Sequence, residues 1–302
     1  MSKLLAGLYS TTALCPTPIS RNHISGPRNG RGRVSETKKS SNRSGSVAIM
    51  MTRTIAVPSL TTASLTSIAG QSPQTITRHI NRKYLQDTIK GGFRFGTIAG
   101  YKPADTAQGG RLGDLQEGSQ RQVFSSRTGV YNGNFIGTNI RDVSIDGFEN
   151  PIVIEYSVND YCSCSSINGF RQDRANTLRA RGNPDIDTFV VYDLEKLTKA
   201  LREIFAENSM WQHFEILSRE VIYGEKDRHW SVEGEIAITE DRDHLEIWLG
   251  TSFVKSTAYE HEEEFRMLVI DPGKAGQLAE NIKHLLIQDP RIAGAIIEHG
   301  HF

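Results

Sequence analysis

The residues best suited to chemistry are four glutamates in the segment 259–266, which reads Tyr-Glu-His-Glu-Glu-Glu-Phe-Arg. They precede an apolar run, residues 265–270, that predicts a buried strand. In extended backbone Glu262 and Glu264 share a face, and like carboxylates held so close raise each other's pKa. Repulsion between two carboxylates destabilises a fold, so such a pair is more readily explained by a function than by a contribution to stability. A solvated strand entrance would show the same charge run, so both interpretations stay open.

A second candidate is a glycine-bounded loop, residues 111–118, placed after an expected strand. It brings together one cation and two acids, Arg111, Asp114 and Glu117. Loops of this composition can clamp a ligand. A turn that is salt-bridged within itself is the alternative.

A third candidate is the segment 161–166, Tyr-Cys-Ser-Cys-Ser-Ser. As a strand it places Cys162, Cys164 and Ser166 on one face and Ser163 and Ser165 on the other. Small hydroxyl groups let a ligand approach the backbone closely. Two thiolates alone are too few for a zinc site, so we expect no metal and interpret the cysteines as small buried side chains.

The elements that must position these residues are mostly strands. Short alternating runs separated by Asn-Gly, Asp-Gly and Asn-Asp turns predict an antiparallel meander over residues 129–165, and further strands are expected at 93–98, 189–192, 214–223, 231–239, 245–254 and 265–270. Helices are expected at 84–90, at 194–208 after the N-cap Asp193, and at 275–284, whereas 170–187 looks like a polar loop. The pattern predicts an α+β fold with mainly antiparallel sheets, in one layer or in two packed sheets.

The domain organisation follows from charge and composition. Residues 1–75 form a Ser- and Thr-rich leader or linker whose first 54 residues hold nine Lys or Arg and one acid, Glu36, and residues 76–302 form a single α+β domain. The leader has four possible interpretations. It is a disordered tail, a segment upstream of a true translation start at Met50 or Met51, an organelle-targeting segment, or a nucleic-acid-binding arm. The chain balances 35 basic against 35 acidic residues, so no global field favours a polyanion. Neither a disulfide framework nor a membrane-spanning run is present, which favours a cytoplasmic location. Phosphate-binding loops of the P-loop and Rossmann types are absent.

The order of these motifs resembles a bacterial domain family of unknown function. The resemblance covers residues 76–290 and rests on Tyr84-Leu85, Gly92-Phe93-Arg94-Phe95-Gly96-Thr97, Arg111-x-Gly113-Asp114-x-x-Glu117-Gly118, Cys164-Ser165, Val221-x-Tyr223 and Lys255-x-x-x-Tyr259-x-x-Glu262-x-Glu264-Phe265-Arg266. Common members carry a longer aromatic and Asn-Asp-Pro signature after the first strand, which this chain lacks.

That family is similar in motif layout to ADP-ribosyltransferases. The resemblance implies that this chain uses NAD as a substrate and needs no metal. Carried over, Arg78 or His79 would hold the NAD ribose, Ser165 would be the central hydroxyl and Glu264 the catalytic acid. Glu262 would orient the acceptor, and the loop residues Arg111 and Asp114 would contact the cofactor. A carboxylate beside the ribose stabilises the oxocarbenium-like cation that forms as nicotinamide leaves.

The resemblance implies a toxin or phage-defence effector that modifies an intracellular protein or nucleic acid, with an antitoxin as a further partner. A binding or sensing module of the same fold, without turnover, is the alternative. It is favoured if Glu264 is salt-bridged to Arg266 or Arg111 and buried away from any cleft. A metal-independent nuclease or RNA-binding protein is a third hypothesis, using His213, His229, His261 and the arginines of residues 171–181.

Overall fold

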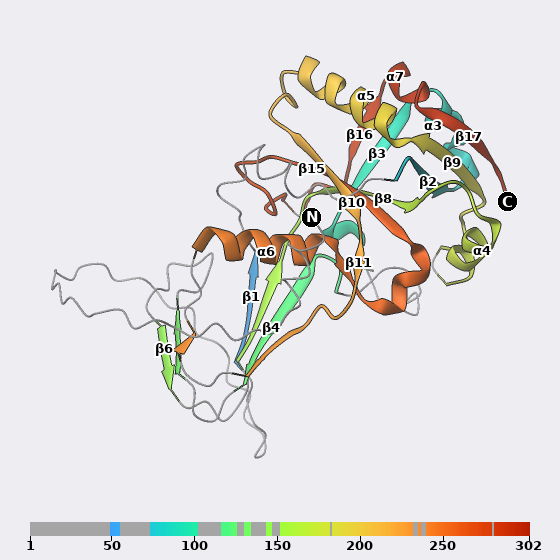
Figure 1. Ribbon diagram of the computed structural model, residues 1–302. Helices are drawn as coiled ribbons and strands as arrows, with labels where there is room; N and C mark the ends of the chain where they lie inside the picture. The colour runs from blue at the N-terminus through green and yellow to red at the C-terminus, as the bar shows by residue number, and fades with distance from the viewer. Residues whose placement is uncertain are drawn as a thin grey trace. The chain divides into compact units, whose positions relative to one another are not determined.

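The computed structural model describes residues 49–54, 73–101, 116–125, 130–133, 143–146, 152–181, 183–231, 235–236, 240–279 and 281–302. The chain has the expected α+β fold, with helices beside strands that pair mainly antiparallel (Figure 1). Among the described residues, no helix combines the length and the apolar character needed to cross a membrane.

The largest sheet contains eight strands, all paired antiparallel. Its main path runs β10-β15-β8-β2-β9-β17, while β3 also pairs with β8 and β16 pairs with β3. The strands are β2 (Thr75–Ile80), β3 (Gly92–Thr97), β8 (Tyr161–Ile167), β9 (Thr188–Asp193), β10 (Glu215–Glu220), β15 (Glu264–Ile270), β16 (Leu285–Gln288) and β17 (Ile296–His301). The strands that carry the early Arg-His pair, the central serines and the late glutamates, β2, β8 and β15, are therefore neighbours.

Three smaller sheets contain the other described strands. A four-stranded sheet has the order β1-β7-β4-β12, a three-stranded one the order β13-β5-β6, and β11 pairs with β14. The strands are β1 (Ile49–Thr54), β4 (Ser119–Ser125), β5 (Val130–Gly133), β6 (Val143–Asp146), β7 (Ile152–Ser157), β11 (Ile222–Tyr223), β12 (Arg228–Ser231), β13 (Glu235–Ile236) and β14 (Val254–Lys255). Because β1 pairs in parallel with β7, paired structure begins earlier than the expected start near residue 76.

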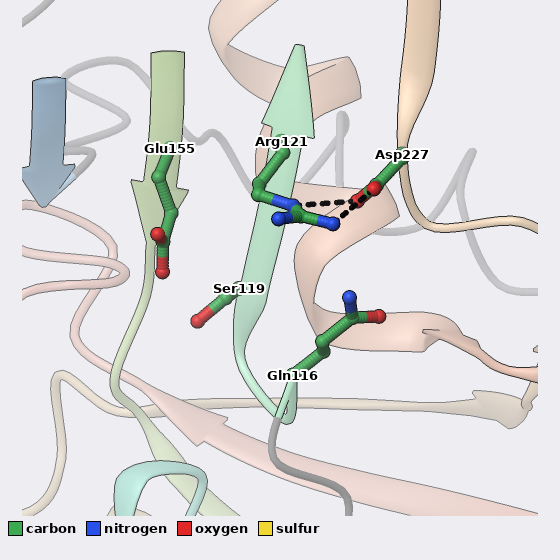
Figure 2. Close-up of a pocket in the computed structure, with 5 residues that line it drawn as sticks. All are labelled: Gln116, Ser119, Arg121, Glu155 and Asp227. Carbon is green, nitrogen blue, oxygen red and sulfur yellow. Dashed lines mark hydrogen bonds and ion pairs between the residues drawn. The ribbon is translucent and has the colours of Figure 1, made fainter. Parts of the chain in front are cut away.

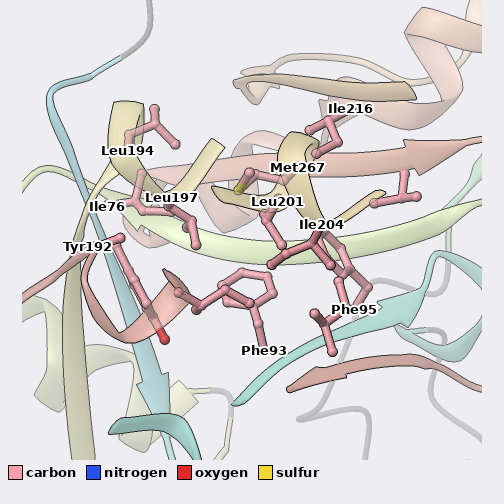
Figure 3. Close-up of a cluster of buried hydrophobic side chains, with 14 of the residues drawn as sticks. Ile76, Phe93, Phe95, Tyr192, Leu194, Leu197, Leu201, Ile204, Ile216 and Met267 are labelled. Atoms are coloured by element: carbon pink, nitrogen blue, oxygen red, sulfur yellow. The ribbon is translucent and has the colours of Figure 1, made fainter. Parts of the chain in front are cut away.

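One helix covers the hydrophobic core of the large sheet, as its sequence predicts. Asp193 caps α5 (Leu194–Glu207) by accepting a hydrogen bond from the backbone N–H of Lys196. The apolar stripe of α5 belongs to one buried cluster with side chains from six strands, including Phe93, Phe95 and Met267 (Figure 3). These residues are almost fully buried. One face of the sheet is thus committed to a dry core, so polar chemistry must use the other face.

The remaining helical elements match the expectations only in part. They are η1 (Arg82–Tyr84), α3 (Leu85–Ile89), η2 (Ala99–Tyr101), α4 (Gln172–Arg181), α6 (Glu240–Phe253), η4 (Thr257–Glu262) and α7 (Pro290–Ala293). The expected helix at 84–90 is confirmed by α3. The polar segment 170–187 contains α4, whose buried residues are Arg174 and Ala175 rather than an apolar stripe, so no helical period signals it. The expected strand at 245–254 is wrong, because most of it belongs to α6, whose Gly250 lies against the Gln120 side chain.

The helix expected at 275–284 is also wrong, since its described residues form turns. Gly276 has a left-handed φ of 80°, which interrupts a helix. The backbone of this segment pairs with Asn159 and Asp160 instead: Asn159 N donates to Gly276 O, and Leu278 N donates to Asn159 O. Asp160 accepts from the backbone N–H of Gly276 and, at 3.0 Å, from the indole Nε1 of Trp248 in α6. A turn signal in the sequence thus ties α6 and the segment 275–279 to the start of β8.

Asp160 should make stability fall as pH rises. Burial raises its pKa from 3.8 to about 7, against the opposing hydrogen bonds from Gly276 and Trp248. Between those values the folded state holds a proton that the unfolded state has released, so the free energy of unfolding decreases with pH, with a slope of at most about 1.4 kcal/mol per pH unit. We expect Asp160→Asn to reduce the pH slope of the unfolding free energy between pH 4 and 7 by up to about 1.4 kcal/mol per pH unit in urea titrations. An unchanged slope in the variant would assign it to another group.

Candidate functional site

The late glutamates lie in a buried cluster of charges. We use the name ion cluster for Glu117, Lys255, Glu262, Glu264 and Arg266. Glu264 begins β15, and its Oε1 accepts from Arg266 Nε at 2.6 Å while its Oε2 accepts from Lys255 Nζ at 2.9 Å. Its side chain is 4% exposed. Burial opposes its ionisation, but Arg266 and Lys255 outweigh that effect and hold the pKa of Glu264 well below its usual range.

The ion cluster joins the two sequence motifs that had looked most specific. Arg266 donates two hydrogen bonds to Glu117, at 2.7 and 2.9 Å, and a third to Ser252 O at 2.6 Å. Glu117 comes from the glycine-bounded loop, and its partner Arg266 comes from the strand Glu264–Ile270. Bidentate arginine–carboxylate pairs hold planar groups in a fixed orientation. The pair therefore fixes the C-terminal end of that loop against β15.

Lys255 links the two late glutamates. Its Nζ donates to Glu262 Oε2 at 2.6 Å and to Glu264 Oε2 at 2.9 Å. Burial lowers the pKa of Lys255, but the two carboxylates more than offset this and leave it above the usual value. Glu262 is the outermost acid, with a side chain 24% exposed. Burial raises the pKa of Glu262 to about 7, which Lys255 opposes and Glu264 reinforces.

The strand register separates Ser165 from Glu264. Cross-strand partners point to the same face, and Ser165 pairs with Phe265, a core residue, whereas Glu264 pairs with Ser166. The side chain of Ser165 thus lies on the core face and that of Glu264 on the opposite face. Alternation along β8 is as expected, but it places Ser166 rather than Ser165 beside the late glutamate. The Ser166 hydroxyl donates to Glu262 O at 3.0 Å.

The register also separates the two early candidates on β2. Arg78 pairs with the core residue Val190, and its guanidinium stacks on the Phe93 ring, 4.4 Å from the centroid. His79 lies on the opposite face with Thr77, whose strand partner is Ser166. The His79 ring packs against Phe170 and Phe302. Burial, followed by the charge of Arg174, lowers the pKa of His79 to about 4, so the ring is neutral at neutral pH.

Other candidate residues are placed as follows. Arg111 and Asp114 lie outside the described residues. Cys162 and Cys164 share a face with Sγ atoms 3.7 Å apart, and the hydrogen bond between them, together with burial, raises the pKa of Cys164. In the described part of the chain, no three side chains of His, Cys, Asp or Glu form a group that could hold a metal ion.

The three histidines of the nuclease hypothesis lie on separate elements, and His261 is near enough to Arg181 for the arginine's charge to lower the pKa of the imidazole. His213 lies beside Asp271 at the end of β15, His229 is in β12 and His261 is in η4. The arginines of α4 and its approach have structural partners: Arg174 binds Ile167 O, Gly169 O and Glu263, and Arg171 binds Asp173 and Glu263.

A polar cavity lies beside the ion cluster. Its volume is about 320 Å³, and it is lined by Gln116, Gly224, Glu225, Lys226, Asp227, His229, Ser256 and Thr257. A smaller cavity of about 110 Å³ shares Gln116 and Asp227 and adds Ser119, Arg121 and Glu155. In Figure 2 the Arg121 guanidinium points at Asp227, with Arg121 Nε 3.0 Å from Asp227 Oδ1. Glu155 is the strand partner of Arg121.

Two of the residues that line the cavity are direct chain neighbours of ion-cluster residues. Gln116 precedes Glu117, and Ser256 follows Lys255. Gly224 N donates to Lys255 O at 2.9 Å, and Lys226 Nζ donates to Gln116 O at 2.6 Å. Sequence reasoning missed this cavity because most of its lining is ordinary surface-type residues in loops. The resemblance did quote Lys255, but nothing in its spacing indicated that it bridges two glutamates.

Comparisons with protein-family models, with curated proteins and with solved structures gave no match for this chain.

Proposed function

We propose that the chain is a non-catalytic binding or sensing module whose ligand occupies the polar cavity. The observation that supports this most directly is the engagement of Glu264, whose two oxygens are bound by Arg266 and Lys255 at 4% side-chain exposure. A carboxylate committed to two cations is poorly placed to stabilise a cation developing on a sugar ring. The position of Ser165 on the core face supports the same conclusion.

The ion cluster then has a positioning role. Binding sites need walls held by rigid supports, and the cavity residues Gln116 and Ser256 are adjacent in sequence to Glu117 and Lys255. The lining offers an ammonium, carboxylates, an imidazole, hydroxyls and an amide. Such a set suits a small polar ligand with several hydrogen-bonding groups.

A cavity-filling variant tests this proposal. A Cβ added at Gly224 would meet nothing within 4 Å, and the same holds at Gly169, which lies outside the cavity lining. We expect Gly224→Leu to fold and to obstruct the cavity, with Gly169→Leu as the matched control. In thermal-shift assays with nucleosides, nucleotides, sugars and amino acids, a ligand at about 100 times its Kd should stabilise wild type and Gly169→Leu by about 2.7 kcal/mol, but not Gly224→Leu. Equal stabilisation of all three proteins would place the ligand elsewhere.

An NAD-consuming ADP-ribosyltransferase is the second candidate, and the neighbouring positions of β2, β8 and β15 favour it. Thr77, Ser166 and Glu264 form one row across these strands, and His79 lies on their face. Glu262 offers a partly exposed carboxylate beside this row. In this alternative the acceptor is an intracellular protein or nucleic acid. His79, rather than Arg78, holds the NAD ribose, and Ser166 takes the role first given to Ser165.

Release of nicotinamide from NAD separates the two candidates. We expect none from the purified wild-type protein supplied with a cell lysate as acceptor. Release by wild type that is lost in a folded Glu264→Gln variant and retained in Glu263→Gln would contradict the binding-module proposal and establish the transferase. Glu263 is a suitable control because it pairs with Arg171 and Arg174 outside the ion cluster.

A further inference from the structure

The ion cluster contains more negative than positive charge. Its three carboxylates, Glu117, Glu262 and Glu264, face two cations, Lys255 and Arg266, through contacts of 2.6–2.9 Å. With every group ionised the net charge is one negative unit. An uncompensated charge in a poorly hydrated interior is costly, and a group in that position neutralises by changing its protonation state. The cluster therefore favours the uptake of one proton.

The contacts identify which carboxylate takes the proton. Glu117 accepts two hydrogen bonds from Arg266, and Glu264 accepts two from Arg266 and one from Lys255. The Glu262 carboxylate accepts a hydrogen bond from Lys255, a donor that it shares with Glu264. A hydrogen bond between the carboxyl groups of Glu262 and Glu264 also raises the pKa of Glu262. When protonated, the Glu262 carboxyl group can donate a hydrogen bond to the Glu264 carboxylate.

Neighbouring charged groups do not supply the missing positive charge. Among the described residues, the titratable and charged groups around this end of the cluster include Cys164 of β8, Tyr223 of β11, Tyr259, Glu260 and His261 of η4, Glu263, and Arg171, Arg174 and Arg181 of α4 and its approach. Burial raises the pKa of Tyr223, so it is neutral. Burial and Arg181 lower the pKa of His261, so it adds little charge at neutral pH. Glu263 already engages Arg171 and Arg174.

We propose that the ion cluster binds one proton at Glu262 in the neutral pH range, and that loss of this proton loosens residues 256–263, whose first two residues line the polar cavity. Ser256 and Thr257 line the cavity. Their segment is tied to the cluster at both ends, by Lys255 before it and by Glu262 and Glu264 at its end. The proton uptake is independent of any ligand, whereas its effect on the cavity wall rests on the proposed function.

Linkage gives the direction of the effect. Opening of the segment would return Glu262 to water, where its pKa is near 4.5 rather than about 7. Between these values the closed form holds a proton that the open form has lost, so a rise in pH favours opening. One proton per opening event corresponds to an increase of up to about tenfold per pH unit. Residues 256–263 are therefore open for a smaller fraction of the time in mild acid than above neutral pH.

Two measurements without ligand test the proposal. Carbon-13 NMR of protein labelled at the glutamate side-chain carboxyls reports the protonation of each carboxyl group. In wild type, the chemical shift of one resonance should titrate with a midpoint near pH 7. This resonance should disappear in Glu262→Gln and persist in Glu263→Gln. If no glutamate titrates above about pH 5.5, or if the neutral titration survives in Glu262→Gln, the assignment is overturned.

Hydrogen exchange tests the coupling to the wall. After correction for the intrinsic pH dependence of exchange, peptides covering residues 256–263 should open up to about tenfold more often per pH unit between pH 5 and 7 in wild type. Glu262→Gln should show no such increase. A neutral titration with pH-independent exchange would overturn the coupling and leave the proton site standing. Neither readout uses the ligand panel, so failure of the panel alone would count against the proposed function and not against the proton site.

Discussion

Replacing Arg266 by methionine should lower the free energy of unfolding by about 3–5 kcal/mol. The side chain is 1% exposed and binds Glu117, Glu264 and the carbonyl of Ser252. Its removal leaves two buried carboxylates without their shared cation, and an uncompensated buried charge costs more than the ion pair itself contributes. Urea unfolding of wild type and variant at pH 7 gives the difference directly.

Two comparisons make the Arg266 result specific. Arg171→Met removes a guanidinium that also binds two carboxylates, but its side chain is 49% exposed, so we expect a much smaller loss. Arg266→Lys keeps the charge and loses the planar pair of donors, and it should fall between wild type and Arg266→Met. If Arg266→Met is no less stable than Arg171→Met, the ion cluster is not the support that we describe.

The sequence predicted the elements whose stability comes from local rules. Asp193 and the apolar stripe of Leu194–Glu207 specify a capped amphipathic helix, and alternation in β8 correctly divided its cysteines from Ser163 and Ser165. Prediction from the sequence failed where tertiary contacts determine the secondary structure. The segment 245–254 has strand-like composition but is mostly helical, because Gly250 allows α6 to approach Gln120 and Trp248 reaches Asp160.

The candidate site was predictable only in its outline. The density of acidic residues drew attention to Glu262, Glu264 and Glu117. Carboxylates held so close together must be either ion-paired with cations or protonated. The identity of those partners depends on pairings between distant segments, such as Arg266 with Glu117, 149 residues apart. The choice between Ser165 and Ser166 depended on strand register, where a shift of one residue moves a side chain to the other face. No local pattern specifies either relation.

Gly118→Ala should cost roughly 2–4 kcal/mol of stability, although it adds a single methyl group. Gly118 has a left-handed φ of 61°, which an L side chain adopts at a cost. The added Cβ would also clash with Cγ2 of the buried Ile98 and lie 2.9 Å from Val158 O. Since Val158 N donates to Gly118 O, the backbone has little freedom to move away. The glycine after Glu117 is therefore required for the turn that delivers Glu117 to Arg266.

Thermal or urea unfolding of Gly118→Ala beside Gly169→Ala measures this requirement. A Cβ at Gly169 meets nothing within 4 Å, so the control should stay within about 0.5 kcal/mol of wild type. In an Ile98→Ala background the methyl group that clashes is gone, and Gly118→Ala should then cost less, about 1–2 kcal/mol, from the left-handed φ and the close approach to Val158 O. A cost that is the same in both backgrounds would show that the contact with Ile98 does not contribute to the requirement for glycine at this position.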